Sequence, residues 1–285
     1  MSSSPADLFH LIGQPARTAI LQALLEQRRD AEDPTLSFTD LRRAAGISDN
    51  GRFNYHLGEL VGLLVVRTDD RYRLSGFGFH LIAPLAGGAY DLDADPAPLS
   101  VPGECHDCGA ALTVRPDEGV LQVVCDDGHV INHGLIGYPG VVNDRDPDDA
   151  ATALALLSTT MTELGVEGVC PLCHGHTDGE FVTDPDGGYA YLAPCADCGN
   201  QFATTAGGCV ASHPAVVSLF DDHGVDVRRR APWTLPFRQL GAETVIAEEP
   251  LQLELRVGIN LDESLTVTLA RDGSVTSLDR SAANN

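Results

Sequence analysis

The sequence contains no lysine. All 18 basic residues are arginine, whereas 41 residues are aspartate or glutamate, so the formal net charge is −23 at pH 7. Concentrated salt keeps such an acidic surface solvated and screens its self-repulsion, which predicts a protein adapted to molar internal salt. Because no acidic block is long enough to form a disordered tail, the charge belongs to folded domains.

Long hydrophobic runs are absent as well. No apolar run approaches the roughly 20 residues needed to span a bilayer. The first residues, MSSSPAD, lack the basic flank and the apolar core of a signal peptide. We therefore predict a cytoplasmic protein with no membrane partner, and in such a chain eight cysteines favour metal binding over disulfides.

The motifs of the common catalytic centres are missing. The sequence has no HExxH, no GxSxG and no glycine-rich phosphate-binding loop. The PCxxC motif from Pro194 to Cys198 has no upstream HxE, so a zinc-deaminase centre is excluded too. We predict that the protein is not an enzyme.

The acidic charge is distributed unevenly along the chain. Residues 1–90 hold 9 arginines and 10 acidic residues, a net charge of −1. Residues 91–285 hold 9 arginines and 31 acidic residues, a net charge of −22. A segment that must approach phosphates would be spared acidification, so the N-terminal third is the candidate for contact with DNA.

The stretch Ser48–Arg73 predicts a helix followed by a two-stranded ribbon. The ribbon consists of two short β-prone runs that meet at Asp69 and Asp70. Helix plus ribbon is how a winged helix-turn-helix presents its recognition helix to the major groove. One face of the predicted helix carries an apolar stripe at helical spacing, formed by Phe53, Leu57, Leu60 and Leu64.

The opposite face of this helix is suited to hydrogen bonding. Arginine can contact guanine, and asparagine can contact adenine, through paired hydrogen bonds. We expect base contacts from the recognition helix and phosphate contacts from the preceding helix and the wing. The alternatives are a partly buried Tyr55 or His56 and a capping role for Asn54. The predicted DNA-binding residues are Arg42, Arg43, Arg52, Asn54, Tyr55, His56, Arg71 and Arg73.

Four cysteines in the C-terminal part form two CxxC pairs. Cys170 and Cys173 are separated from Cys195 and Cys198 by 21 residues. Each CxxC turn places two thiolates on one side, and two such turns complete a tetrahedral zinc site with Zn–S distances of about 2.3 Å. Four thiolates leave no open position, so the predicted site is structural. The alternative, a thioredoxin-like redox pair, needs only one CxxC, at a helix N-terminus.

An earlier cysteine segment is less regular. It supplies three thiolates from Cys105, Cys108 and Cys125, and His129 follows in the same predicted turn as Cys125. We expect His129 to complete a second structural zinc site. The alternatives for the fourth ligand are His106, His133 and Cys209.

Composition divides the chain into six segments. We predict a DNA-binding domain over 1–90, an acidic, proline-rich linker over 91–103, a first zinc-binding segment over 104–145, a helix over 146–168, a zinc ribbon over 169–210, and a helix plus β-sheet over 211–285. The predicted fold class is α+β. An N-terminal winged helix-turn-helix precedes zinc-ribbon-like knuckles and a small α/β C-terminal domain.

Residues 8–85 resemble the ArsR-type winged helix-turn-helix regulators in the form found in haloarchaea. The resemblance implies a homodimer that pairs through the first and last helices of the domain and reads a pseudo-palindrome in double-stranded DNA. The CxC metal-sensing motif of some ArsR regulators is absent, since residues 1–104 contain no cysteine. The matching stretches are IGQPARTAILQAL, FTDLRRAAGI, NGRFNYHLGELVG and RTDDRYRLS.

Together these patterns predict a sequence-specific, DNA-binding transcriptional regulator with two structural zinc sites. The acidic C-terminal part, which resembles the extension of a subset of these regulators, is expected to bind a protein partner or a small effector, not DNA. Two alternatives come from other classes. One is a winged-helix and zinc-ribbon adaptor of the transcription machinery, and the other is a zinc or redox sensor with a labile first site.

Overall fold

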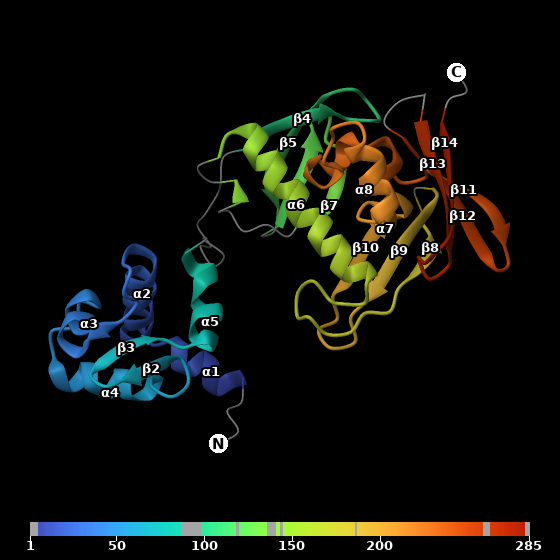
Figure 1. Cartoon of the computed structure of the whole chain (residues 1–285). Helices are drawn as coiled ribbons and strands as arrows, with labels where there is room; N and C mark the ends of the chain where they lie inside the picture. The colour runs from blue at the N-terminus through green and yellow to red at the C-terminus, as the bar shows by residue number, and fades with distance from the viewer. Residues whose placement is uncertain are drawn as a thin grey trace. The chain divides into compact units, whose positions relative to one another are not determined.

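The computed structural model describes residues 5–86, 98–117, 120–135, 141–142, 145–185, 187–258 and 263–282 (Figure 1). Over these residues the chain is mixed α+β, with eight α-helices and four antiparallel sheets. It divides into two compact units, residues 1–94 and 95–285. Among the described helices, none combines the length and the apolar character that crossing a membrane requires.

The N-terminal unit contains five helices and one small antiparallel sheet. The sheet has the strand order β1-β3-β2, so the short first strand lies beside the last. The elements in chain order are α1 Pro5–Ile12, α2 Pro15–Asp30, β1 Leu36–Ser37, α3 Phe38–Ala44, α4 Asn50–Leu60, β2 Val65–Thr68, β3 Arg71–Leu74 and α5 Gly76–Ala86.

Side-chain caps begin α3 and α4. The hydroxyl of Ser37 accepts a hydrogen bond from the N–H of Asp40, which confirms the predicted capping box. The carboxylate of Asp49 accepts from the N–H of Arg52. Each cap satisfies a backbone donor that has no partner inside its helix. Gly46, at φ 67°, turns the chain between the two helices.

The predicted apolar stripe of α4 forms part of the core of this unit. Phe53, Leu57, Leu60 and Leu64 are at most 2% exposed and pack against buried residues of α2, α3 and β3. Burial of a side chain of this size stabilises the fold by about 1.5–3 kcal/mol. The polar face of α4 is therefore the face left to solvent.

The predicted ribbon is present as the β2–β3 hairpin. Its register pairs Val65 with Leu74, and Asp69 takes φ 52° in the turn. Aspartate tolerates this left-handed conformation better than most residues do. The sequence does not predict β1, because two residues are too few to show a strand periodicity.

The second unit contains three antiparallel sheets and three helices. The strand orders are β4-β5-β6-β7, β10-β9-β8 and β11-β12-β13-β14. The first part consists of β4 Leu99–Glu104, β5 Ala111–Asp117, β6 Val120–Cys125, β7 Val130–Leu135 and α6 Pro147–Val166. The middle part consists of β8 Glu180–Thr183, β9 Tyr189–Pro194, β10 Gln201–Thr205, α7 Ala206–Val210 and α8 Pro214–Asp221.

Three 3-10 turns lead into the last sheet of this unit. The predicted strands over 251–257 and 264–270 and the turn over 271–274 are confirmed by β12, β13 and the hairpin to β14. Alternate residues of β12 face the core, as expected for a sheet with one solvated face. The elements are η2 Val227–Arg229, η3 Pro232–Thr234, η4 Pro236–Arg238, β11 Glu243–Glu248, β12 Leu251–Gly258, β13 Glu263–Ala270 and β14 Val275–Ala282.

The predicted linker over 91–103 extends too far. Leu99–Glu104 form β4, which pairs with β5, and Val101 is 7% exposed in the core of the first sheet. Prolines at 98 and 102 give this stretch the composition of a linker. Proline is nevertheless tolerated in an edge strand, where β4 lies. Residues 91–97 of the predicted linker lie outside the described residues.

Segments far apart in the sequence share one core in the second unit. Trp233, the single tryptophan, packs with the first sheet and with α6, and its Nε1–H donates to the carbonyl of Pro102 at 2.9 Å. The larger core joins α7 and α8 to the last two sheets. The four segments predicted after residue 103 are therefore parts of a single compact unit.

Candidate functional site

Two turns bring together the four cysteines of the second metal cluster. Cys170 and Cys173 follow α6, and Cys195 and Cys198 lie between β9 and β10. Their Sγ atoms lie within 4.8 Å of one another, with 3.7 Å from Cys170 to Cys198 and 3.5 Å from Cys173 to Cys195. Metal–sulfur distances of about 2.3 Å in a tetrahedral site give sulfur–sulfur edges of about 3.8 Å. The spacing therefore fits a tetrahedral metal ion.

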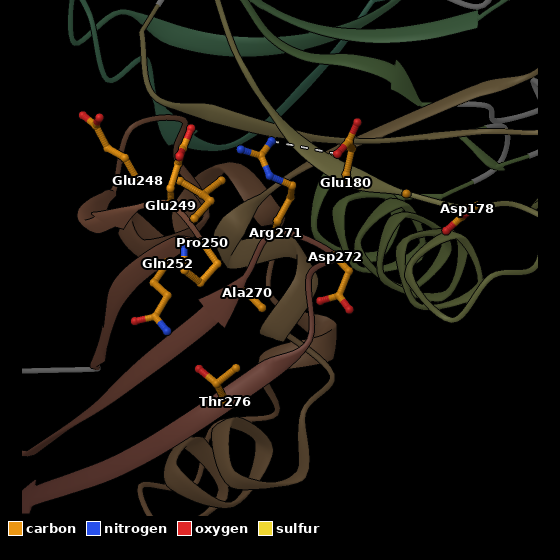
Figure 2. Close-up of a pocket in the computed structure, with 12 residues that line it drawn as sticks. Asp178, Glu180, Glu248, Glu249, Pro250, Gln252, Ala270, Arg271, Asp272 and Thr276 are labelled. Carbon is orange, nitrogen blue, oxygen red and sulfur yellow. Dashed lines mark ion pairs between the residues drawn. The ribbon is translucent and has the colours of Figure 1, made fainter.

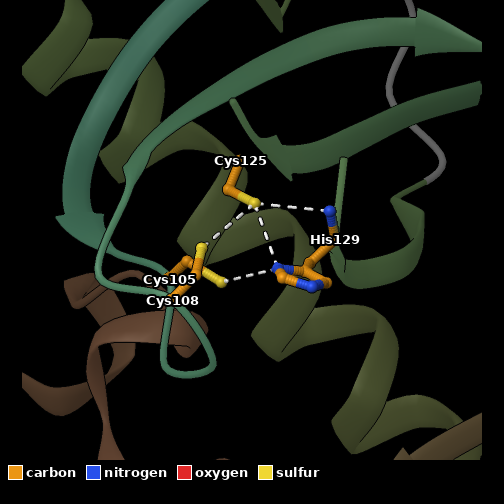
Figure 3. A group of neighbouring side chains, drawn as sticks. All are labelled: Cys105, Cys108, Cys125 and His129. Carbon is orange, nitrogen blue, oxygen red and sulfur yellow. Dashed lines mark hydrogen bonds between the residues drawn. The ribbon is translucent and has the colours of Figure 1, made fainter. Parts of the chain in front are cut away.

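The first metal cluster contains Cys105, Cys108, Cys125 and His129 (Figure 3). Two of its cysteines lie in the turn between β4 and β5, and the other two residues lie at the turn between β6 and β7. Nδ1 of His129 faces the sulfurs, at 3.4 Å from Cys125 and 3.6 Å from Cys105. The Sγ atoms of Cys108 and Cys125 are 3.7 Å apart.

The structure places His129 beside the three thiols. Of the alternatives, His106 lies 3.4 Å from the carboxylate of Asp107, and Cys209 packs against the core around α7 and α8. The side chain of His133 lies outside the described part of the chain. The eight predicted ligands thus form two groups of four, and each group can hold a metal ion such as zinc.

The same backbone turn recurs at all three CxxC pairs. The N–H of the fifth residue donates to the carbonyl of the first cysteine at 2.8–3.0 Å, from Gly109, His174 and Gly199 respectively. These residues have φ values of 73°, 62° and 75°. Such angles favour glycine, which explains the glycine that follows two of the pairs and leaves His174 as the exception.

Replacing His174 with glycine should stabilise the second unit. A side chain at this φ costs about 1 kcal/mol, and the greater freedom of glycine in the unfolded chain offsets part of the gain. We expect His174→Gly to raise the free energy of unfolding by roughly 0.5 kcal/mol in a denaturant titration of the zinc-loaded protein. Gly199→Ala, the converse change at an equivalent turn, should lower it by about 1 kcal/mol. Equal effects of the two variants would contradict this explanation.

Backbone donors around the clusters favour thiolates. The N–H of Cys173 is the largest of the influences that lower the pKa of Cys170 to about 6. The N–H of Gly175 donates to Cys173 Sγ at 3.4 Å, and that of His129 donates to Cys125 Sγ at 3.3 Å. Because thiolate is the form that binds metal ions, these turns present their sulfurs in the appropriate state.

In the N-terminal unit the predicted base-reading residues share the exposed face of α4. Arg52, Asn54 and Tyr55 are exposed, and Tyr55 is 60% exposed in spite of its large ring. Within the described residues the guanidinium of Arg52 forms no ion pair. His56 is half-buried next to them, and burial is the main cause that lowers its pKa. Three of the four predicted base contacts therefore face solvent together.

The predicted phosphate contacts are used differently. Arg42 donates to two backbone carbonyls of the turn before α4, at 2.9 and 2.8 Å. Arg71 pairs with Asp33 at 2.7 Å and so holds the wing to the segment before β1. Arg43 and Arg73 remain exposed, although Arg43 lies 3.2 Å from Asp40. Arg42 and Arg71 thus stabilise the turn and the wing through contacts inside the unit.

The sequence did not single out Arg17, which positions α4. Arg17 is 4% exposed; its Nη2 pairs with Glu59 of α4 at 3.1 Å, and its Nη1 donates to the carbonyl of Leu11 of α1 at 3.3 Å. One signal could have identified it. Arg17 lies one helical turn before the buried Ile20 and Leu21, on the apolar side of α2.

Comparison with protein-family models gives two matches. Residues 102–275 match the model described as Domain of unknown function (DUF7351), which covers more than half of the chain and contains both metal clusters. The chain belongs to the DUF7351 family. Residues 5–84 match a second model, Domain of unknown function (DUF7347). No curated protein and no solved structure is similar enough to the chain to count as a match.

The family boundaries agree with the architecture of this DUF7351 protein. The DUF7351 match begins within β4 and ends at the first residue of β14, so it spans the first two sheets of the second unit and most of the third. The DUF7347 match covers α1 through most of α5. The two metal clusters therefore belong to one domain, and the exposed face of α4 belongs to the other.

Proposed function

We propose that this protein is a sequence-specific, DNA-binding transcriptional regulator of the winged helix-turn-helix type, with a structural zinc ion in each metal cluster. The observation that carries the proposal is the exposed face of α4, with Arg52, Asn54 and Tyr55, on a helix whose other face is buried. This face lies in the part of the chain that has a net charge of −1, whereas residues 91–285 carry −22.

The order of elements in the N-terminal unit supports a winged helix. α3, a tight turn and α4 have the order of a helix-turn-helix, and the β2–β3 hairpin follows where a wing would lie. Arg17 links α4 to α1, and Arg42 holds the turn before α4. These contacts would fix the angle at which α4 enters the major groove.

Each exposed residue of α4 has a role in this proposal. Arg52 would donate to guanine and Asn54 would pair with adenine, each contributing about 1–3 kcal/mol of discrimination. Tyr55 would contact base edges or the sugar-phosphate backbone with its ring and its hydroxyl. Arg43 and Arg73, both exposed, would contact phosphates, which position the protein without reading sequence.

Zinc is the ion that we propose for both clusters. Thiolate and imidazole ligands in a tetrahedral arrangement favour zinc over magnesium, calcium and manganese, which prefer oxygen ligands. Four protein ligands fill the coordination sphere, so the ions would cross-link the turns and would not activate water. Cys105, Cys108, Cys125 and His129 would hold one ion, and the four cysteines from 170 to 198 would hold the other.

The exposed aromatic residues of α1 and α5 support a homodimer. Phe9 is 70% exposed on α1 and Phe77 is 49% exposed on α5. These helices are the first and last of the unit, and large exposed apolar side chains favour burial against a partner. We propose that α1 and α5 pair with those of a second copy, so that two α4 helices read an inverted repeat.

Selection of binding sites from random DNA tests this function. With full-length, zinc-loaded protein we expect enrichment of an inverted repeat whose half-sites are centred about 10 base pairs apart, one turn of the duplex. The double variant Phe9→Asp/Phe77→Asp should be monomeric in sedimentation and should enrich single half-sites with weaker binding. If no sequence is enriched while the protein co-purifies with RNA polymerase, the adaptor function replaces this proposal.

A further inference from the structure

A pocket of about 960 Å³ opens in the second unit, outside both metal clusters (Figure 2). It lies between the start of β8 and two turns of the last sheet, which join β11 to β12 and β13 to β14. Neither a metal ligand nor a predicted DNA contact lines it. The lining residues are Asp178–Glu180, Glu248–Gln252, Ala270–Asp272 and Thr276.

The pocket is strongly acidic. It contains one basic residue, Arg271, which pairs with Glu180 at 3.9 Å (Figure 2). The four other carboxylates form no ion pair with any described residue, which leaves the pocket with a charge of −4. Among them, Asp272 is kept ionised by hydrogen bonds from Ser274, which lower its pKa. The unpaired carboxylates belong to Asp178, Glu248, Glu249 and Asp272.

A buried tyrosine reaches the wall of the pocket. Tyr191 is 3% exposed, and a Cβ added to Gly179 would lie only 2.4 Å from its hydroxyl oxygen. Gly179 lines the pocket, so the hydroxyl lies directly behind a residue that has no side chain to cover it. Within the described part of the chain this hydroxyl has no hydrogen-bond partner. Buried hydroxyls are nearly always paired, so the one at Tyr191 indicates a missing ligand.

The spacing of the carboxylates excludes a compact metal site. Among the described residues, only the two cysteine clusters bring three or more ligand atoms within 4.8 Å of one another. The acidic groups of the pocket are therefore too widely spaced to share one divalent ion. Separated carboxylates around a cavity of this volume instead suit an organic cation whose positive charges are spaced along its length.

We propose that this pocket binds an organic oligoamine, a linear cation with two or more protonated amino groups. One ammonium group would lie between Glu248 and Glu249, and a second would lie near Asp272 and donate to the Tyr191 oxygen. The proposal goes beyond DNA binding and assigns the regulator a small cationic effector. It uses no residue of the N-terminal unit, so it can fail or succeed independently of the proposed function.

Calorimetric titration of full-length, zinc-loaded protein with spermidine tests the pocket. At 1 M KCl the Debye length is about 3 Å, so diffuse attraction is screened and only a seated ligand gives saturable heat. We expect one equivalent to bind. Glu248→Gln/Glu249→Gln should weaken binding at least tenfold, and Tyr191→Phe should weaken it about threefold with an unchanged melting temperature. The matched control is Glu254→Gln/Asp279→Asn, which removes the same charge from exposed positions of the same sheet and should change binding less than twofold.

Four results would overturn the oligoamine site. The first is the absence of saturable heat with spermidine. The second is equal weakening by the two double variants, which would show diffuse charge attraction. The third is displacement of spermidine by an equal concentration of Mg²⁺, which would show a site for any cation. The fourth is saturable binding of a lysine-rich peptide without binding of spermidine, which would make the pocket a peptide site. None of these readouts involves DNA.

Discussion

Replacing Cys170 with serine should release one of two zinc ions and unfold much of residues 95–285. Cys170 is fully buried, and its sulfur lies 3.7 Å from that of Cys198 on the opposite turn. Without this thiolate the two turns lose their common ligand, and β8, β9 and β10 lose the cross-link at their end. Structural zinc contributes about 10–16 kcal/mol to the folding of isolated zinc-finger peptides. A unit with its own apolar core should still lose several kcal/mol.

Two measurements check this result. Metal analysis should find two equivalents of zinc in the natural protein and one in Cys170→Ser. Denaturant unfolding followed by the fluorescence of Trp233, which packs in the core of the unit, should shift to much lower denaturant. Cys209→Ala is the matched control, since Cys209 lies outside both clusters and its loss should leave two equivalents bound. Retention of two equivalents by Cys170→Ser would disprove the assignment of Cys170 as a ligand.

Replacing Arg52 with alanine should weaken binding to the selected operator by about 10- to 100-fold per half-site. The exposed guanidinium forms no ion pair with the described residues, so it is free to donate to a base edge. A bidentate contact with guanine accounts for about 1–3 kcal/mol, and a dimer would lose it twice. Because Arg52 is exposed, the melting temperature should stay nearly the same.

The control for Arg52 separates base reading from charge. Arg29→Ala removes the same charge from an exposed position at the end of α2, where Arg29 pairs with Asp30. Fluorescence anisotropy with the operator and with a scrambled duplex should show a loss of discrimination for Arg52→Ala and unchanged discrimination for Arg29→Ala. Equal losses on both duplexes would mean that Arg52 contacts only phosphates.

Local patterns were enough to predict the helix α4 and the β2–β3 hairpin. Helical spacing of Phe53, Leu57 and Leu60 identifies the buried face, and the capping side chain of Asp49 marks the start of the helix. These signals involve residues within one or two turns of one another, so they can be seen without knowledge of the rest of the chain.

Contacts between distant segments were not predictable in the same way. Arg42 and Arg71 have the composition of phosphate contacts, yet Arg42 bonds to a turn and Arg71 pairs with Asp33, 38 residues away. The strand β4 has the composition of a linker because its prolines conceal the alternation that buries Val101. In each case a partner outside the local window decides the role of the residue.

The two metal clusters show both kinds of information side by side. The CxxC spacing specifies the turn, the inward sulfurs and the left-handed residue that follows, because all of these depend on five consecutive residues. The choice of His129 over His106 depends on the β6–β7 turn meeting the β4–β5 turn, which requires the whole first sheet. The pocket next to Tyr191 depends on tertiary structure entirely, since packing of the second and third sheets brings residues near 178, 249 and 272 together. Ligand types and their turns are local properties of this chain, whereas the cavities and the unpaired groups around them arise only when distant strands pack.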